Sequence, residues 1–354
     1  MEHKERCFRQ VHVIGKGKTM GQEIQQGVFY LKKCVIALKW AERLAQLRPL
    51  CERLAEAGVG CQAMLSEELA KYREEAGLPS PQGEEGVLYL TDDPGAYAML
   101  SEESGEEPSV LIYLHPDNAN EDFGNAKYAM EEPEETETEY LERVYRRCHD
   151  LPWEIMVTER CWLRETVEED VDSFWEMYQA PELTRYTERL YPTPEAERRY
   201  VREYRRLVYS FYEYGIWTVL DRRSGAVVGR AGLSIREGYD LPELGFVIGR
   251  DWQRQGLAGE VCRGILDHAR KQLGFERIQV LVHEENSVSL HLCRKLGFQE
   301  QAPPYIAESC GGGQSGKKLR FPLVEMEQNG RRERFVYMVY QSPQQESITS
   351  PLGA

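Results

Sequence analysis

The chain has 354 residues, which exceeds the usual size of one domain, so two domains are expected. Its hydrophobic content of 41% suffices for ordinary cores, but no stretch approaches the roughly 20 apolar residues of a membrane span, and residues 1–6 contain no apolar signal segment. The net charge of −15 argues against a general nucleic-acid binder, because phosphate affinity needs clustered Lys and Arg, and it is compatible with a cationic substrate such as an amine.

These properties predict a cytoplasmic protein that binds neither a membrane nor a nucleic acid. Its nine cysteines are scattered, with no Cys-x-x-Cys pair and no His partner at zinc spacing. We therefore expect reduced and mostly buried thiols, and no metal site.

Residues 1–150 are predicted to form a small α/β domain. Apolar residues recur at helical spacing from about Gly27 to Ala57, with a break at Pro49, and 66–75 is a further helix. Apolar runs at 86–90 and 110–114 indicate buried strands. This alternation of helix and strand favours a partly parallel sheet.

Asp92 and Asp93 directly follow the first of these strands, where open α/β sheets bind ligands. The arrangement resembles the closing part of a haloacid-dehalogenase phosphatase domain. That family also needs an Asp-x-Asp pair on an early strand, and the sequence has none, so the resemblance implies a degenerate domain. The alternative interpretation is that the two carboxylates cap the following helix.

The acidic run at 131–139 contains few apolar groups and is interpreted as a solvated linker that merges into a helix over 140–149. The domain boundary is placed near 150. A second domain then extends over 151–341, and 342–354 is expected to be a disordered tail.

The second domain begins with a strand over 161–164 and a helix whose apolar face includes Val171 and Phe174. Thr193 and Pro194 open a helix that reaches about Tyr214, and its many aromatic rings either line an acceptor pocket or belong to the core. A hairpin over 216–229 and a strand to about 236 follow. The last strand is expected at 335–340.

The centre of this domain is a strand, a glycine turn and a helix. The strand is the apolar run at 244–248, the turn is Gln253–Glu260, and apolar residues recur at helical spacing after it. Gly256 and Gly259 allow close approach of the backbone to a ligand, and the first turn of a helix attracts anions. The pattern predicts a phosphate site. A strand at 277–282 and a helix at 285–298, closed by Gly297, come next.

These segments resemble the GNAT N-acetyltransferase family. The acyl-CoA motif Gln/Arg-x-x-Gly-x-Gly/Ala is met by Gln253, Gly256 and Ala258. The second signature is met by Asn286 and Ser289, followed by Lys-Leu-Gly-Phe at 295–298. Segments 158–165 and 181–186 are similar to the ribosomal-protein N-terminal acetyltransferase branch. The resemblance covers Glu159 to Gln341 and implies a mixed, mostly antiparallel central sheet flanked by helices.

The resemblance also implies acetyl-CoA as cosubstrate. The backbone N–H groups from Gln255 to Gly259 would hold the pyrophosphate, and Val247 and Ile248 would bond the pantetheine arm. Asn286 is the family's other CoA contact, although an Asn here is equally explained as a helix N-cap. The full expected set is Val247, Ile248, Gln253, Arg254, Gln255, Gly256, Leu257, Ala258, Gly259, Asn286 and Ser289.

The implied activity is acetyl transfer to a primary amine, either a protein N-terminus or a small molecule. Such an amine must lose a proton, and Glu243 at the start of the central strand is the candidate base; its alternative role is a surface carboxylate at the strand edge. The Tyr that often protonates the thiolate is replaced by Cys293, which leaves the general acid unassigned and favours a buried structural thiol. The alternative function is a non-catalytic CoA-binding or regulatory module.

Overall fold

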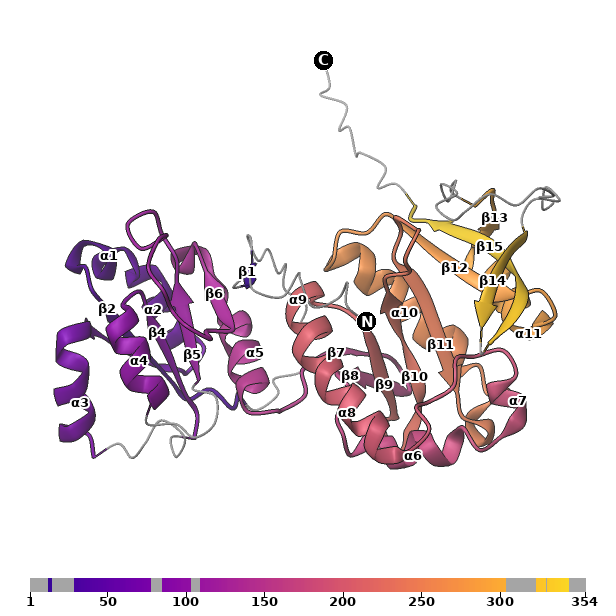
Figure 1. Ribbon diagram of the computed structural model, residues 1–354, viewed down its shortest axis with the longest axis horizontal. Helices are drawn as coiled ribbons and strands as arrows, with labels where there is room; N and C mark the ends of the chain where they lie inside the picture. The colour runs from indigo at the N-terminus through magenta and orange to yellow at the C-terminus, as the bar shows by residue number, and fades with distance from the viewer. Residues whose placement is uncertain are drawn as a thin grey trace, which may run out of the picture. The chain divides into compact units, whose positions relative to one another are not determined.

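The computed structural model of the protein describes residues 12–14, 29–77, 85–102, 109–303, 323–328 and 330–343. The chain divides into two compact units, Met1–Trp153 (unit 1) and Glu154–Ala354 (unit 2), and each contains one sheet with helices packed against it (Figure 1). No helix within the described ranges combines the length and the apolar character that a membrane span requires. Most of the tail expected at 342–354 lies outside the described residues.

Unit 1 is built on a six-stranded sheet with the order β1-β6-β5-β4-β2-β3, in which every described pair of neighbours is parallel. Its strands are β1 (His12–Ile14), β2 (Lys33–Leu38), β3 (Gly60–Leu65), β4 (Val87–Thr91), β5 (Val110–Tyr113) and β6 (Tyr128–Met130). The two strands expected at 86–90 and 110–114 are confirmed as β4 and β5. The sheet is more fully parallel than the sequence predicted.

The helix expected from Gly27 onward is wrong over 33–38, because this segment is the strand β2. The spacing of Leu31, Val35 and Leu38 fits a helix, but the residues between Val35 and Leu38 are apolar as well. All residues from Cys34 to Leu38 are at most 1% exposed. A parallel strand with helices on both faces must be apolar at every position, so the uninterrupted run indicated a central strand.

Helices cover both faces of this sheet. They are α1 (Ala41–Gln46), α2 (Arg48–Glu56), α3 (Leu69–Glu75), α4 (Pro94–Glu102) and α5 (Thr138–Cys148), with short 3₁₀ turns η1 (Ser66–Glu68) and η3 (Pro133–Glu135). Leu54 of α2 and Leu141 of α5 belong to one apolar cluster with Ile36 of β2, whereas Leu69 of α3 and Leu100 of α4 belong to another. The unit is therefore a three-layer α/β structure.

The acidic run at 131–139 lies inside unit 1 rather than between the units. It connects β6 to α5, and the apolar face of α5 is buried in the same cluster as α2. The reason is that Tyr140, Leu141 and Val144 provide enough apolar surface to anchor the helix, although the preceding segment is acidic.

Cys51 of α2 and Cys61 of β3 form a disulfide, with their Cα atoms 5.5 Å apart. This corrects the expectation that all cysteines are free thiols. The two residues are ten positions apart in sequence, and they meet because α2 packs back against the strand that follows it. Cys34, Cys161, Cys262 and Cys293 are buried free thiols, as expected.

Unit 2 contains a nine-stranded sheet whose main path is β13-β15-β12-β11-β10-β9-β8-β7, with β14 paired to β15. Its strands are β7 (Glu154–Val157), β8 (Cys161–Arg164), β9 (Ile216–Asp221), β10 (Val227–Ser234), β11 (Glu243–Ile248), β12 (Arg277–His283), β13 (Gln299–Glu300), β14 (Leu323–Gln328) and β15 (Arg331–Gln341). Among the described pairs, β11 with β12 is parallel and the others are antiparallel. The mixed, mostly antiparallel sheet is confirmed.

The helices of unit 2 pack against this sheet (Figure 1). They are α6 (Asp170–Met177), α7 (Pro181–Thr184), α8 (Pro194–Tyr204), the π-helical η4 (Arg205–Tyr209), α9 (Ser210–Tyr212), the 3₁₀ turn η5 (Arg250–Trp252), α10 (Leu257–Lys271) and α11 (Ser287–Leu296). Thr193 caps α8 by accepting a hydrogen bond from the Ala196 N–H at 3.2 Å. The core joins α10 and α11 to the central strands, with Trp217 of β9 fully buried.

Candidate active site

The turn between β11 and α10 has the geometry of an anion site. Gly256 is the N-cap of α10 with a φ of +81°, in the left-handed region that favours glycine. The N–H of Glu260 makes a helical hydrogen bond to the Gly256 carbonyl at 3.1 Å. The N–H groups from Leu257 to Gly259 therefore lie in the first turn, where the helix itself provides no acceptor. The positive end of the helix dipole adds to the attraction for a phosphate.

Strands β11 and β12 diverge in the segment before this turn. Their pairing consists of one register pair, Glu243 with Gln279, and the Gln279 N–H donates to the Pro242 carbonyl at 2.9 Å. Successive residues of a strand direct their backbone groups to alternate sides, so Phe246 and Ile248, like Pro242, direct theirs toward β12. Beyond the register pair, these groups face the gap between the two strands.

The structure gives Val247 a different orientation from the expected one. The Val247 carbonyl oxygen lies 2.1 Å from the Cβ position that Gly229 of β10 lacks, so it is directed at β10 and not at the gap. The Ile248 carbonyl accepts a hydrogen bond from Gln253 Nε2 at 2.9 Å, and its N–H remains on the side of the gap. The sequence did not identify Phe246 as a residue whose backbone groups face the gap. Backbone groups alternate between the two sides of a strand, but which residues face which neighbour is known only once one interstrand hydrogen bond is known.

Glu243 is the first residue of β11, and only 7% of its surface is exposed. Its carboxylate accepts hydrogen bonds from Arg236 Nη2 at 2.8 Å and from Arg236 Nε. This contact is the main cause that raises the pKa of Arg236. A carboxylate has about four acceptor positions, so the bidentate pair fixes Glu243 without using all of them.

Asn286 is the N-cap of α11, and its side-chain oxygen accepts a hydrogen bond from the Ser289 N–H at 3.1 Å. The helix-cap interpretation of Asn286 is therefore correct, and the cap uses the side-chain oxygen and not the amide NH₂. Cys293 lies on the buried side of the same helix with no exposed surface, and burial raises the pKa of its thiol to about 12. A buried structural thiol is confirmed.

A pocket of about 260 Å³ opens between the end of α6 and the segment after α7. It is lined by Trp175, Tyr178, Gln179, Thr184, Arg189, Leu190, Tyr191 and Pro192. The rings of α8 that were expected either to line a pocket or to fill the core do not contribute to this lining. Tyr200 contacts the lining residue Tyr191 with ring centroids 5.2 Å apart and the two rings tilted by 35°.

The sequence model of the acetyltransferase (GNAT) domain matches residues 160–299. This match contains the diverging strands, the glycine turn and the two helices described above. Residues 160–299 form a GNAT acetyltransferase domain. GNAT enzymes are acyltransferases that use acetyl-CoA, and residues 160–299 carry the domain of this family.

Two curated relatives are similar to the GNAT domain. The uncharacterized N-acetyltransferase p20 of Bacillus licheniformis is 26% identical over 152 residues, which is 42% of this chain and 84% of the relative. The uncharacterized N-acetyltransferase YoaA of Bacillus subtilis is 25% identical over 154 residues, again 42% of this chain and 84% of the relative. Among solved structures, a putative ribosomal-protein-serine acetyltransferase from Vibrio cholerae is 17% identical, with a TM-score of 0.42; the match covers 53% of this chain and 97% of that chain.

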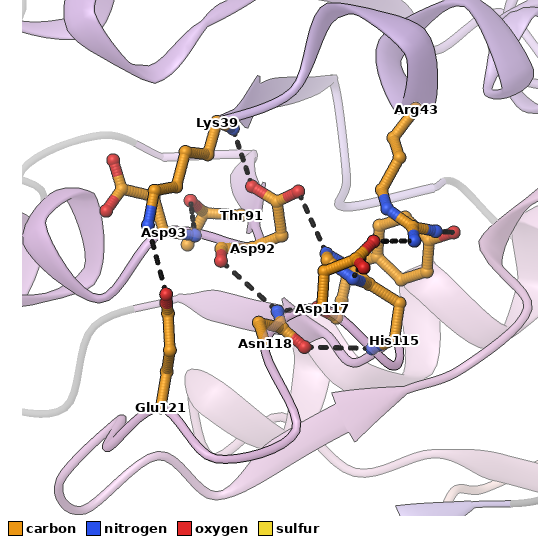
Figure 2. A network of polar contacts seen from close by, with 10 residues as sticks. Lys39, Arg43, Thr91, Asp92, Asp93, His115, Asp117, Asn118 and Glu121 are labelled. Atoms are coloured by element: carbon orange, nitrogen blue, oxygen red, sulfur yellow. Dashed lines mark hydrogen bonds and ion pairs between the residues drawn. The ribbon is translucent and has the colours of Figure 1, made fainter.

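Unit 1 has a network of polar side chains at the carboxyl ends of β2, β4 and β5 (Figure 2). Asp92 is fully buried and accepts hydrogen bonds from the Lys39 N–H at 2.6 Å and, at the other oxygen, from His115 Nε2 at 3.2 Å. Burial raises the pKa of Asp92, although these two contacts oppose the shift. Asn118 donates to the carbonyls of Asp92 and Tyr113 at 3.2 and 2.8 Å.

The two carboxylates after β4 have different roles. Asp93 accepts a hydrogen bond from the Gly95 N–H at 2.9 Å in the first turn of α4, so the helix-capping interpretation is correct for Asp93. Asp92 instead holds the ends of neighbouring strands together. The cations beside it are paired as well, Lys39 with Glu121 at 3.0 Å and Arg43 with Asp117. Within the described ranges, no three His, Cys, Asp or Glu side chains are grouped to hold a metal ion.

Replacement of Asn118 by Ala tests the structural role of this network. Asn118 is fully buried and also accepts a hydrogen bond from the His115 N–H at 2.9 Å, so its loss leaves three buried backbone groups without this partner. We expect unfolding of unit 1 to become easier by at least about 2 kcal/mol. Urea unfolding measures the change, and hydrogen exchange assigns it to unit 1.

The matched control is Asn120→Ala, because Asn120 is exposed and lies two positions further along the same loop. Its effect should stay within about 0.5 kcal/mol. Equal effects of the two substitutions would contradict a structural role specific to Asn118.

Proposed function

We propose that the chain transfers the acetyl group of acetyl-CoA to the primary amine of a protein N-terminus or of a small molecule. The observation that carries this proposal is the divergence of β11 from β12 directly before the glycine turn of α10. A bound acetyl-CoA supplies the activated acyl carbon and the leaving thiolate. The backbone of this chain would hold it at two places, the gap between the strands and the first turn of α10.

The donor contacts follow from the backbone groups described above. The N–H groups from Leu257 to Gly259 would bind the pyrophosphate, and those of Phe246 and Ile248 would bond the pantetheine arm. Among the residues expected to bind CoA, Gln253 would contribute indirectly, because its side chain donates a hydrogen bond to the Ile248 carbonyl and so positions Ile248. The Asn286 amide would provide a further polar contact while its oxygen caps α11.

We propose Glu243 as the general base for the amine. Its carboxylate lies at the point where the two strands separate, and Arg236 fixes its orientation. In this proposal the bound amine would reach the Glu243 carboxylate directly or through one water. The thiol of Cys293 is fully buried and has a raised pKa, which does not support it as the general acid.

The donor site is tested by the pair Gly256→Asp and Gly256→Asn. Asp and Asn have the same shape and are the residues that best tolerate a positive φ, so both variants carry the same backbone strain. Only Asp adds a negative charge beside the pyrophosphate. Calorimetry should show CoA binding to the Asp variant at least about tenfold weaker than to the Asn variant. Equal affinities would place the pyrophosphate elsewhere.

The base is tested by Glu243→Gln in steady-state kinetics on an amine identified from a panel of peptides, polyamines and small amines. Loss of a general base lowers kcat/KM by about 10²- to 10⁴-fold, while CoA affinity should not change. Cys293→Ala is the control, with a stability loss of about 1 kcal/mol and a normal rate. A rate collapse in the Cys293 variant with a normal Glu243 variant would reverse the assignment. No turnover of any amine by the wild type, with CoA bound, would favour a non-catalytic CoA-binding module.

We further propose that unit 1 is a separate α/β domain without phosphatase activity. Both oxygens of Asp92 accept hydrogen bonds from the chain, and the residue after β2 is Lys39 in place of a carboxylate. The full-length protein should therefore release no phosphate from p-nitrophenyl phosphate when Mg²⁺ is added. Magnesium-dependent release that is abolished by Asp92→Asn would refute this proposal.

A further inference from the structure

The side chain of Arg160 lies across the turn that opens α10. Arg160 precedes β8, about a hundred positions before the turn in sequence. Its Nε donates to Glu260 Oε2 at 2.7 Å, and its Nη1 donates to the Gln255 carbonyl at 2.8 Å. Its Nη2 lies 3.6 Å from the position that a Cβ of Gly256 would occupy. A guanidinium is thus held next to the N–H groups of the helix's first turn.

Glu260 anchors this guanidinium. Its carboxylate also accepts hydrogen bonds from the Thr158 hydroxyl at 2.6 Å and from the Arg160 N–H at 2.8 Å. Burial by itself raises the pKa of Glu260, but the hydrogen bonds from Thr158 and Arg160 outweigh burial, and the net pKa is lowered. Glu260 therefore stays ionised at neutral pH, and the ion pair persists below the ordinary pKa of a Glu.

The side-chain hydrogen bonds of Arg160 to the described residues do not use all the N–H donors of its guanidinium. A guanidinium has five N–H donors, and among the described residues Glu260 and Gln255 engage only Nε and Nη1. Nη2 is the nitrogen beside Gly256. Since 45% of the side chain is exposed, a ligand can reach it. The remaining donors are in a position to meet the oxygens of a bidentate anion.

We infer that Arg160 is a phosphate-binding residue of the donor site and that Glu260 is the positioning residue that aims it. This inference rests on the proposed function, because it takes the CoA pyrophosphate as the anion. Arg160 adds a full positive charge to the partial charge of the helix N-terminus. It also ties the turn between β7 and β8 to α10, so a part of unit 2 outside the CoA motif contributes to donor affinity.

The experiment measures binding of CoA and of 3′-dephospho-CoA by calorimetry to the full-length protein and its Arg160→Ala variant. Both ligands contain the pyrophosphate, so Arg160→Ala should weaken both by the same factor, about tenfold to a hundredfold. The salt dependence of binding should also become shallower. A loss confined to CoA would assign Arg160 to the 3′-phosphate and overturn the inference as stated.

Arg222→Ala is the matched control. Arg222 Nη1 donates to the carbonyls of Thr158 and Glu159 at 3.0 and 3.2 Å, so it supports the same turn as Arg160 without a described contact to Gln253–Glu260. CoA affinity of this variant should stay within about twofold of the wild type, near the limit of error for such measurements. An equal loss in both Arg variants would overturn the inference, because support of the turn would then explain both.

Glu260→Gln separates charge from position. Arg160 keeps its charge in this variant but loses its ionic anchor, so CoA affinity should fall between those of the wild type and Arg160→Ala. Unchanged affinity would overturn the positioning role of Glu260. Circular dichroism checks that each variant is folded, and Arg160→Gln provides a second, longer replacement if the Ala variant is not. If the wild type binds CoA and Arg160 variants bind it equally well, only this inference fails; if the wild type does not bind CoA, the proposed function fails.

Discussion

The separation of β11 from β12 is the constraint on which the organisation of unit 2 depends. Backbone N–H and C=O groups inside a protein need partners, and an antiparallel neighbour provides them along β10 and β15. The parallel pair of β11 with β12 provides them only at the register pair of Glu243 with Gln279. The sheet therefore contains a gap lined by backbone groups, and an extended ligand with amide groups would complete the ladder there.

The glycine turn follows this gap and leads to the N-terminus of α10, which carries a partial positive charge. After β11 the chain passes through η5, and the left-handed conformation of Gly256 then leads it into α10, so the gap and the helix N-terminus follow one another along the chain. One local and one distant contact keep the turn in place: Gln253 holds the Ile248 carbonyl five positions before it, and Arg160 holds the Gln255 carbonyl. The conformation of the turn is thus supported by a side chain of the turn itself and by one from the segment before β8.

Unit 1 places polar groups at a corresponding edge but satisfies them internally. The carboxyl ends of its parallel strands carry Lys39, Asp92 and His115, and these groups bond one another (Figure 2). The two cations at this edge also have carboxylate partners, because Lys39 pairs with Glu121 and Arg43 pairs with Asp117. In unit 2 the groups at the gap are backbone groups that face a neighbouring strand they do not reach. This difference explains why only the second site is proposed to bind a cosubstrate.

The sequence by itself determined the local structure of unit 2 and the position of its glycine turn, because glycine placement, helix caps and apolar periodicity act over a few residues. It failed at β2, where a continuous apolar run also has helical spacing, and for the Cys51–Cys61 disulfide, which depends on how α2 folds back on β3. Only the tertiary structure decided that the backbone groups of Phe246 face the gap while the Val247 carbonyl faces β10. It also decided that Arg236 pairs with Glu243 and that Arg160 reaches the turn. These facts depend on strand register and on contacts between residues far apart in the chain, and both arise only when the whole sheet has formed.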